Sequence, residues 1–182
     1  MENTALFIPV LFGSIRDERI SDKDAAYVAS LLKARGIQTE LIDPKSLHKA
    51  ESTERKDPEP WASLMEKADA LVIVSPEYNH GYPGALKEVL DSCYDEYKHK
   101  PVAICGASGG GLGGARAVEQ LRQVVIELSM VPIHNAVYFS MHQNLWDEKG
   151  QIKDPSYAER VNTMIDELTW YAHALKAARA QN

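Results

Sequence analysis

Residues 70–84 read ALVIVSPEYNHGYPG, and this stretch decides the class of fold. Its first five residues, Ala70–Val74, are all apolar, which is typical of a parallel strand buried on both faces of a sheet. The polar residues that follow predict a loop, and Pro83 predicts the start of a helix. Strand, loop and helix in this order form the repeating unit of an α/β protein.

The same alternation of strands and helices runs through the whole chain. We expect strands at Ala5–Phe12, Ile37–Asp43, Ala70–Ser75, Val102–Cys105 and Ile133–Tyr138. We expect helices near Ser21–Arg35, Pro60–Ala68, Pro83–Tyr97, Gly114–Leu128 and Ser156–Ala180. This alternation predicts a parallel sheet with right-handed crossovers and helices on both faces.

Two strands carry further information about the sheet. Residues 37–41 alternate in polarity, as suits an edge strand, so the strand order 2-1-3-4-5 fits the chain. Pro9 lies inside the first apolar run and has no N–H to donate to a neighbouring strand. We therefore expect a local irregularity at Pro9.

Length and composition exclude several classes of protein. A chain of 182 residues predicts a single domain spanning residues 1–182, and a net charge of −6 argues against nucleic-acid binding. The apolar runs fall short of the roughly 20 residues of a membrane helix, so we expect no membrane insertion. Cys93 and Cys105 are the only cysteines, and the histidines have no ligand-like spacing. We expect no disulfide framework, no metal site and a cytoplasmic location.

The unusual residues of the sequence fall in three loops, after the first, third and fourth strands. In an open parallel sheet, ligands bind outside the carboxyl ends of the strands. Loop 1 (Gly13–Ser21) combines hydroxyls, two arginines and a helix start, which favours an anion and most naturally a phosphate. The alternative is that Ser21 only caps the helix and the arginines are solvated. Asp17 and Glu18 also weigh against a phosphate.

Loop 2 (Pro76–Gly84) contains two tyrosines, an asparagine and a histidine between prolines. A stiffened loop of this kind can present hydrogen bonds and a flat edge to a planar ring. The alternative is a simple start of a helix with both tyrosines packed in the core.

Loop 3 (Gly106–Gly114) is rich in glycine, which indicates close approach of the backbone to something flat or charged. Gly109, Gly111 and Gly114 match a dinucleotide fingerprint in spacing, but the loop follows the fourth strand, and no acidic residue ends the next strand to hold a ribose. Gly106-x-Ser108-x-Gly110 matches a nucleophile elbow. The remaining members of an esterase triad follow in the right chain order: Asp147, Asp154 or Asp166, with His173. An esterase would leave loops 1 and 2 unexplained.

Taken together, the three loops resemble the NADPH-dependent FMN reductase family over nearly the whole chain. The motifs that carry the resemblance are Gly13-Ser14-Ile15-Arg16, Pro76-Glu77-Tyr78-Asn79 followed by Pro83-Gly84, and Gly109–Gly114 leading to Ala115-Arg116-Ala117. The resemblance implies a three-layer flavodoxin-like fold, a five-stranded parallel sheet in the order 2-1-3-4-5, FMN as the cofactor, and NADPH or NADH as the electron donor.

The resemblance also assigns cofactor-binding residues by motif position. The residues implied around the phosphate are Ser14, Arg16, Arg19 and Ser21. Those implied along the ribityl chain and the isoalloxazine ring are Pro76, Glu77, Tyr78 and Asn79. Those whose backbone would approach the pyrimidine edge are Ser108, Gly109 and Gly110. This chain departs from the family at Arg19, where serine is common, at Ser21, where asparagine is common, and at Gly81, where a serine is usual and glycine predicts a looser turn.

The implied reaction passes hydride from the nicotinamide to flavin N5 and then to a small-molecule acceptor such as a quinone, an azo compound, free flavin or an oxidised metal ion. It requires no side-chain acid or base, so no catalytic residue is nominated. A flavin-binding electron carrier without nicotinamide turnover is the alternative, since the acidic charge and the fold suit it equally.

The family also suggests a homodimer or homotetramer. In the predicted third helix, Tyr94 and Tyr97 broaden the apolar stripe beyond one buried face, as an interface would, although a larger local core explains them equally well. The core stripe itself comprises Leu86, Val89, Leu90 and Cys93. We expect the segment 44–59 to be a surface loop without chemistry and the segment 142–155 to contact a ligand or a partner subunit.

Overall fold

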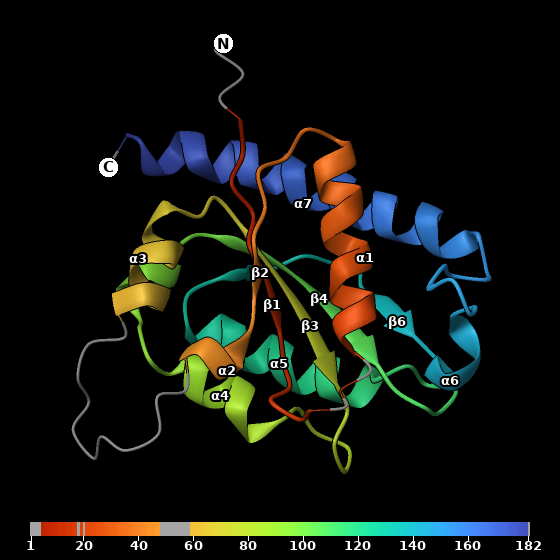
Figure 1. Ribbon diagram of the computed structural model, residues 1–182. Coiled ribbons are helices and arrows are strands. Elements are labelled where there is room, and N and C mark those ends of the chain that lie inside the picture. Colours follow the sequence, from red (N-terminus) through yellow and green to blue (C-terminus); the bar gives the residue numbers. More distant parts are fainter. Residues whose placement is uncertain (1–4, 18, 20, 48–58, 182) are drawn as a thin grey trace.

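The computed structural model describes residues 5–17, 19, 21–47 and 59–181, and it has a parallel sheet at its centre (Figure 1). The strands are β1 (Val10–Phe12), β2 (Leu41–Ile42), β3 (Leu71–Pro76), β4 (Pro101–Ala107), β5 (Val131–Pro132) and β6 (Val137–Phe139). The order is β2-β1-β3-β4-β5, and β6 also pairs with β4, in each case in parallel. The predicted order 2-1-3-4-5 and the flavodoxin-like fold are confirmed.

Helices cover both faces of the sheet (Figure 1). One face carries α1 (Ser21–Ala34) and α7 (Ser156–Arg179). The other carries α3 (Glu59–Lys67), α4 (Gly84–Leu90) and α5 (Ala115–Glu127). Three further helical segments are α2 (Pro44–Leu47), η1 (Asp95–Tyr97) and α6 (His142–Leu145). Within the described ranges, none of the helices combines the length and the apolar character needed to cross a membrane.

The apolar run at residues 70–74 forms most of β3, and all residues of this strand are buried. Because successive side chains of a strand point to opposite faces, Val72 and Val74 pack under α1 and α7, whereas Leu71 and Ile73 pack under α3, α4 and α5. The sheet therefore separates two hydrophobic cores, and its continuous apolar strand contributes to both.

The irregularity expected at Pro9 is confirmed. Ile8 and Val10 donate their N–H groups to the carbonyls of Gln38 and Glu40, at 2.8 and 2.9 Å. Pro9 accepts the N–H of Val72 at 3.0 Å but has no N–H to donate. Regular strand structure accordingly begins only at Val10.

The last predicted strand, Ile133–Tyr138, is wrong in its bounds: β5 ends at Pro132 and β6 begins only at Val137, and side chains bond the backbone of the residues between them. Arg122 of α5 donates to the carbonyls of Ile133 and His134, at 2.7 and 3.0 Å. Glu167 of α7 accepts the N–H groups of His134 and Asn135, at 2.9 and 2.8 Å. These long-range contacts satisfy the backbone of the interruption.

The predicted helix Pro83–Tyr97 is wrong beyond Leu90, where α4 ends and η1 follows. Tyr97 is completely buried, and its hydroxyl accepts the indole N–H of Trp61 at 2.5 Å, so it belongs to the core and not to an interface stripe. Tyr94, by contrast, is 48% exposed. The expected core stripe of α4 is confirmed at its buried members, Leu86, Val89 and Leu90.

The segment predicted as the surface loop 44–59 begins with α2. Residues 48–58 lie outside the described part of the chain. Leu47 packs against the core under α3 and α4, so the beginning of the segment is attached to the body of the protein.

Candidate cofactor-binding site

Loops 1, 2 and 3 meet at the carboxyl edge of the sheet. They follow β1, β3 and β4, which are direct neighbours in the sheet. Gly13 donates its N–H to the carbonyl of Val74 at 2.9 Å, and Glu77 donates to Ala107 at 3.1 Å. These bonds extend the strand pairing into the loops, so the three sequence motifs share one edge.

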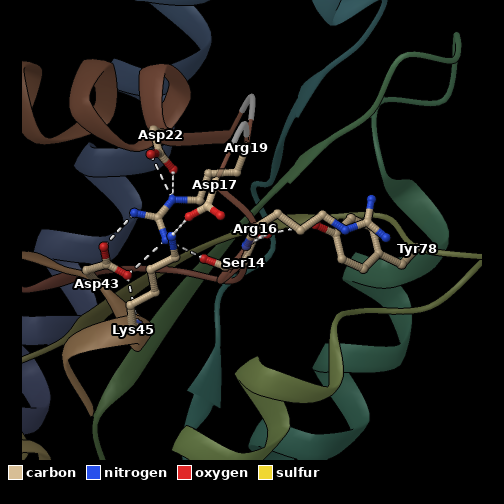
Figure 2. A network of polar contacts seen from close by, with 8 residues as sticks. All are labelled: Ser14, Arg16, Asp17, Arg19, Asp22, Asp43, Lys45 and Tyr78. Atoms are coloured by element: carbon tan, nitrogen blue, oxygen red, sulfur yellow. Dashed lines mark hydrogen bonds and ion pairs between the residues drawn. The ribbon is translucent and has the colours of Figure 1, made fainter. Parts of the chain in front are cut away.

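Ser14 and Arg16 of loop 1 are both tied to Tyr78 of loop 2 (Figure 2). The hydroxyl of Ser14, which is completely buried, hydrogen-bonds the Tyr78 hydroxyl at 2.6 Å and accepts the N–H of Arg16 at 3.3 Å. The guanidinium of Arg16 lies over the Tyr78 ring, 3.9 Å from its centroid. Arg16 is exposed and pairs with no carboxylate among the described residues. Its charge is therefore available to an anion at the edge of the site.

The guanidinium of Arg19 is hydrogen-bonded to other residues of the protein (Figure 2). Its Nε donates to Asp22 at 2.7 Å, and Nη1 donates to the Ser14 carbonyl at 2.8 Å and to Asp43 at 2.9 Å. Nη2 donates to the second oxygen of Asp43 at 2.5 Å. These bonds use all but one of the five N–H groups of the guanidinium. Arg19 thus joins loop 1 to the start of α1 and to the end of β2.

The charges around this arginine follow from its contacts. Burial raises the pKa of Asp43, but the hydrogen bonds from Arg19 and from the Lys45 N–H, together with the arginine charge, hold that pKa below its usual value. Asp17, which weighed against a phosphate in the sequence, accepts a hydrogen bond from Lys45 Nζ at 2.5 Å, and this contact lowers the pKa of Asp17. Glu18 lies outside the described residues.

Ser21 is the first residue of α1 and is completely buried, yet its hydroxyl has no hydrogen-bond partner among the described residues. The first turn of a helix also has N–H groups without intrahelical acceptors and carries a partial positive charge. An unsatisfied buried hydroxyl costs about 1–3 kcal/mol. An anion at this helix start would relieve that cost, which is the arrangement a phosphate group requires.

Loop 2 is a tight turn with Asn79 and His80 at its tip. Tyr78 and Gly81 exchange two backbone hydrogen bonds of 2.8 and 3.0 Å, and the two central residues have φ values of 50° and 69°. Positive φ at both positions is characteristic of a type I′ turn, which asparagine tolerates well.

Loop 2 is also fastened to α5. The carboxylate of Glu77, whose side chain is only 5% exposed, accepts the backbone N–H of Arg116 at 3.2 Å and pairs with the Arg116 side chain. Gln120 donates to the His80 carbonyl at 3.0 Å. A Cβ added at Gly81 would lie 3.1 Å from Gln120 Oε1, so the glycine makes room for this contact. The looser turn expected from Gly81 is therefore wrong.

The glycines of loop 3 divide into two sets. Gly106, Gly113 and Gly114 approach the chain itself: an added Cβ would lie 2.5 Å from the Gly113 carbonyl oxygen, 2.8 Å from Tyr138 Cβ and 2.7 Å from Ala107 N, respectively. Gly109, Gly110 and Gly111 are exposed, and their N–H groups have no acceptor within the described part of the chain. The second set offers a row of main-chain donors at the edge of the sheet.

The esterase arrangement is not assembled. Ser108 Oγ donates to the Gly110 carbonyl at 3.2 Å. His173 lines a cavity with Ala5, Leu6 and Gly36, which precede the amino ends of β1 and β2. It therefore lies at the opposite edge of the sheet from Ser108. The nucleophile and its expected base do not meet.

Sequence reasoning missed one group of residues beside loop 3. Met141, His142 and Gln143 contact its backbone carbonyls, and His142 also contacts Asp24 of α1. Nothing in the local sequence signals these contacts, because Asp24 and His142 are 118 residues apart.

Comparison with known proteins agrees with this geometry. Residues 7–144 match the family described as NADPH-dependent FMN reductase. The chain is 32% identical over 123 residues to an NAD(P)H-dependent FMN reductase of Pseudomonas aeruginosa, a match that covers 65% of this chain and 66% of that relative, just under two thirds of its length. It is 30% identical over 172 residues to a 2-hydroxy-1,4-benzoquinone reductase of a Burkholderia species, covering 89% of this chain and 93% of the relative.

Among solved structures, a flavoenzyme NAD(P)H:(acceptor) oxidoreductase from Paracoccus denitrificans resembles this chain with a TM-score of 0.73 at 22% identity. The resemblance covers 92% of this chain and 99% of that one, and it supports the fold. Because the family match extends over well more than half of the sequence, the chain belongs to the NADPH-dependent FMN reductase family.

Proposed function

We propose that the chain binds FMN where loops 1, 2 and 3 meet and reduces small acceptors, such as quinones, with electrons from NADPH or NADH. The observation that carries the proposal is the chemical asymmetry of this edge. Loop 1 and the start of α1 offer a free positive charge and a buried hydroxyl without a partner among the described residues, whereas loop 3 offers a row of free main-chain donors. A phosphorylated flavin has an anionic end and an acceptor-rich ring, which suit these two kinds of donor. Membership of the family supports the same assignment.

At the phosphate end, we assign binding to Ser14, Arg16 and Ser21. The Arg16 guanidinium lies over the Tyr78 ring. A bound phosphate would accept charge-assisted hydrogen bonds from this guanidinium in place of part of its contact with the ring. The Ser21 hydroxyl and the first N–H groups of α1 supply further donors. Arg19 has one N–H left, so we assign it to holding loop 1 in shape.

At the ring end, we assign one side of the flavin to loop 2 and the pyrimidine edge to loop 3. Pro76 and Glu77 contribute main chain, because the Glu77 carboxylate is occupied by α5, while Tyr78 and Asn79 contribute side chains. The backbone of Ser108, Gly109 and Gly110 lies along the pyrimidine edge. Their carbonyls already have donors, and the Ser108 N–H donates to the Phe139 carbonyl at 3.0 Å, so the main-chain groups left for a ligand are the N–H groups of Gly109 and Gly110.

When bound, FMN would supply the redox chemistry of the reaction, the transfer of hydride and electrons between nicotinamide and acceptor. The protein contributes orientation and electrostatics. The fixed main-chain N–H groups of loop 3 would stabilise negative charge at the edge of a bound ring, because they are already in place before the reaction. The Glu77 carboxylate is paired with Arg116, and the Arg116 side chain also contacts His80 at 2.6 Å, so neither loop 2 group is a free base. This arrangement is consistent with a reaction that needs no side-chain acid or base.

The second candidate function is an electron-carrier module without nicotinamide turnover, which the net charge of −6 and the fold also suit. Steady-state oxidation of NADPH with a benzoquinone as acceptor, and with no partner protein, distinguishes the two. Sustained turnover by the FMN-loaded protein supports the reductase. A protein that binds FMN but oxidises no NADPH or NADH with any quinone, azo compound, free flavin or ferric chelate is a carrier.

We further propose that the chain forms a homodimer, or a homotetramer built from it, through the face around Tyr94 and Ile126. Both side chains are large and exposed, at 48% and 60%. They lie close together, since the Tyr94 hydroxyl donates to the carbonyl of Glu127 at 3.1 Å. Sedimentation of the wild type and of Ile126→Asp tests this: the variant is expected to sediment as a monomer, and an unchanged oligomer would place the interface elsewhere.

For location, we propose a reducing compartment such as the cytoplasm. Cys93 and Cys105 are both free thiols. Burial raises the pKa of Cys93 to about 11 and that of Cys105 to about 12, which keeps both thiols protonated and unreactive.

A further inference from the structure

We propose that the side chains of Asp24, His142 and Trp146 form a buried brace that positions the cofactor site, because these three side chains tie the helix at the phosphate end to the glycine loop at the ring end. This inference rests on the proposed function and assigns a task to the segment Met141–Trp146, which follows β6.

The brace is buried and closely connected. Asp24 is completely buried and His142 is 5% exposed. His142 Nε2 lies 3.1 Å from one carboxylate oxygen of Asp24 and 3.0 Å from the other. Trp146 Nε1 lies 3.1 Å from the same histidine nitrogen. Burial raises the pKa of Asp24, although the neighbouring His142 and Trp146 side chains act in the opposite direction. The carboxylate therefore depends on these partners.

One end of the brace fixes loop 3. His142 N–H donates to the Ser108 carbonyl at 3.2 Å, and Met141 N–H donates to the Gly110 carbonyl at 3.1 Å. Gln143 Nε2 donates to the Gly109 carbonyl between them at 3.3 Å. Three successive carbonyls of loop 3 are thus held by three successive residues of the segment. This leaves the N–H groups of the glycines as the free main-chain groups of the loop.

The backbone at the start of the segment is held in an unusual conformation. Met141 has a φ of 48°, in the left-handed region that residues with a side chain seldom adopt. Such a conformation persists only where the surroundings hold it. The anchoring of His142 by Asp24, next to Met141, supplies that hold.

The other end of the brace belongs to the phosphate side of the site. Asp24 lies in the first turn of α1, three residues after Ser21. Asp22, in the same turn, bonds Arg19, which in turn holds the carbonyl of Ser14. The first turn of α1 is therefore joined to loop 1 through Asp22 and, by way of His142, to loop 3 through Asp24, so it links the two loops assigned to the two ends of the cofactor.

Stability alone does not account for a buried polar cluster at this place. Replacing both partners of a buried polar contact by apolar side chains of the same shape is often nearly neutral or stabilising. The neighbourhood is apolar: Trp146 packs against the Tyr27 ring, with centroids 5.9 Å apart, and Leu145 and Tyr157 belong to the same core. Apolar residues would fill this space, but they would not orient His142 and the segment that carries it.

The test compares FMN and riboflavin binding to apoprotein, by quenching of flavin fluorescence, in the double variant Asp24→Leu/His142→Leu. We expect FMN and riboflavin to bind at least 10-fold more weakly, and the visible circular dichroism of bound flavin to change, with a melting temperature close to that of the control. The control is Asp69→Asn/Lys176→Met, which removes a 2.9 Å ion pair at the opposite edge of the sheet and is expected to keep both affinities.

Three outcomes overturn the brace. A folded double variant that binds FMN within twofold of the wild type, with an unchanged flavin spectrum, shows that the brace does not position the site. An equal loss of affinity in the control pair shows a general effect of stability. Trp146→Phe keeps the packing on Tyr27 and removes one donor, so it serves if the double variant does not fold: we expect FMN binding at least threefold weaker, and an unchanged affinity refutes the proposal. If the wild type itself binds no FMN, the proposed function fails instead.

Discussion

Replacing Arg16 with alanine is expected to weaken FMN binding by about 10- to 100-fold and to leave riboflavin binding unchanged. The structure gives this arginine no carboxylate partner among the described residues and one aromatic contact, the Tyr78 ring at 3.9 Å. Riboflavin lacks the phosphate and has the same ring, so the pair of ligands isolates the contribution of Arg16 to the phosphate end.

The magnitude follows from the contacts that Arg16 makes and is free to make. A charge-assisted hydrogen bond contributes about 1.5–3 kcal/mol, and 1.4 kcal/mol corresponds to about tenfold in affinity. The cation–π contact with Tyr78 at an exposed site contributes about 0.5–1 kcal/mol to the apoprotein, and FMN binding would sacrifice part of it. Removing the guanidinium should therefore change the free energy of unfolding of the apoprotein by no more than about 1 kcal/mol.

Fluorescence titration of apoprotein with each flavin measures both affinities, and thermal unfolding of the same samples checks the fold. Arg16→Lys keeps the charge but loses the two-pronged geometry, so an intermediate FMN affinity is expected. The assignment of Arg16 to the phosphate is refuted if Arg16→Ala weakens riboflavin and FMN equally, or if it weakens neither.

Three further predictions concern the residues that support the site and one buried charge far from it. Arg19→Ala is expected to destabilise the apoprotein by about 1–3 kcal/mol in urea unfolding, since it leaves Asp22 and Asp43 without their partner; an unchanged midpoint would contradict the clamp described for loop 1. Gly113→Ala is expected to lower the free energy of unfolding by about 1–3 kcal/mol, because φ is 57° and the new Cβ would clash with Tyr138. Gly111 has open space around it, so the control variant Gly111→Ala should unfold like the wild type. Burial lowers the pKa of Lys100 from 10.5 to about 8, so the unfolded chain binds more protons than the folded one between these pH values. The free energy of unfolding relative to Lys100→Met should therefore rise by about 3 kcal/mol from pH 8 to pH 10.5, and parallel pH profiles of the two proteins would contradict the lowered pKa.

The sheet and its order were predictable because they depend on local patterns. The continuous apolar run at Ala70–Val74 predicts a strand that is buried on both faces of the sheet. Pro9 predicts a missing hydrogen bond, because proline has no N–H to donate. The break between β5 and β6 was not predictable, because it depends on Arg122 and Glu167, which are distant in sequence.

The site was predictable as a meeting of three loops, but not in the division of labour within each loop. Arg16 and Arg19 look alike in the sequence. Asp43, which lies 24 residues beyond Arg19, accepts hydrogen bonds from Arg19 and not from Arg16, and the sequence does not reveal this pairing. In loop 3 the sequence does not distinguish the glycines that make room for the chain from those that face outward, because the difference arises from Tyr138 and Ala107. Long-range packing decides both cases.

The anaerobic visible spectrum of the FMN-loaded protein during addition of NADPH tests the proposed function most directly. We expect that apoprotein takes up one FMN per chain, that NADPH bleaches the bound flavin, and that a quinone restores its colour. A chain that takes up no FMN, or a bound flavin whose spectrum neither NADPH nor NADH changes, would contradict the proposed function.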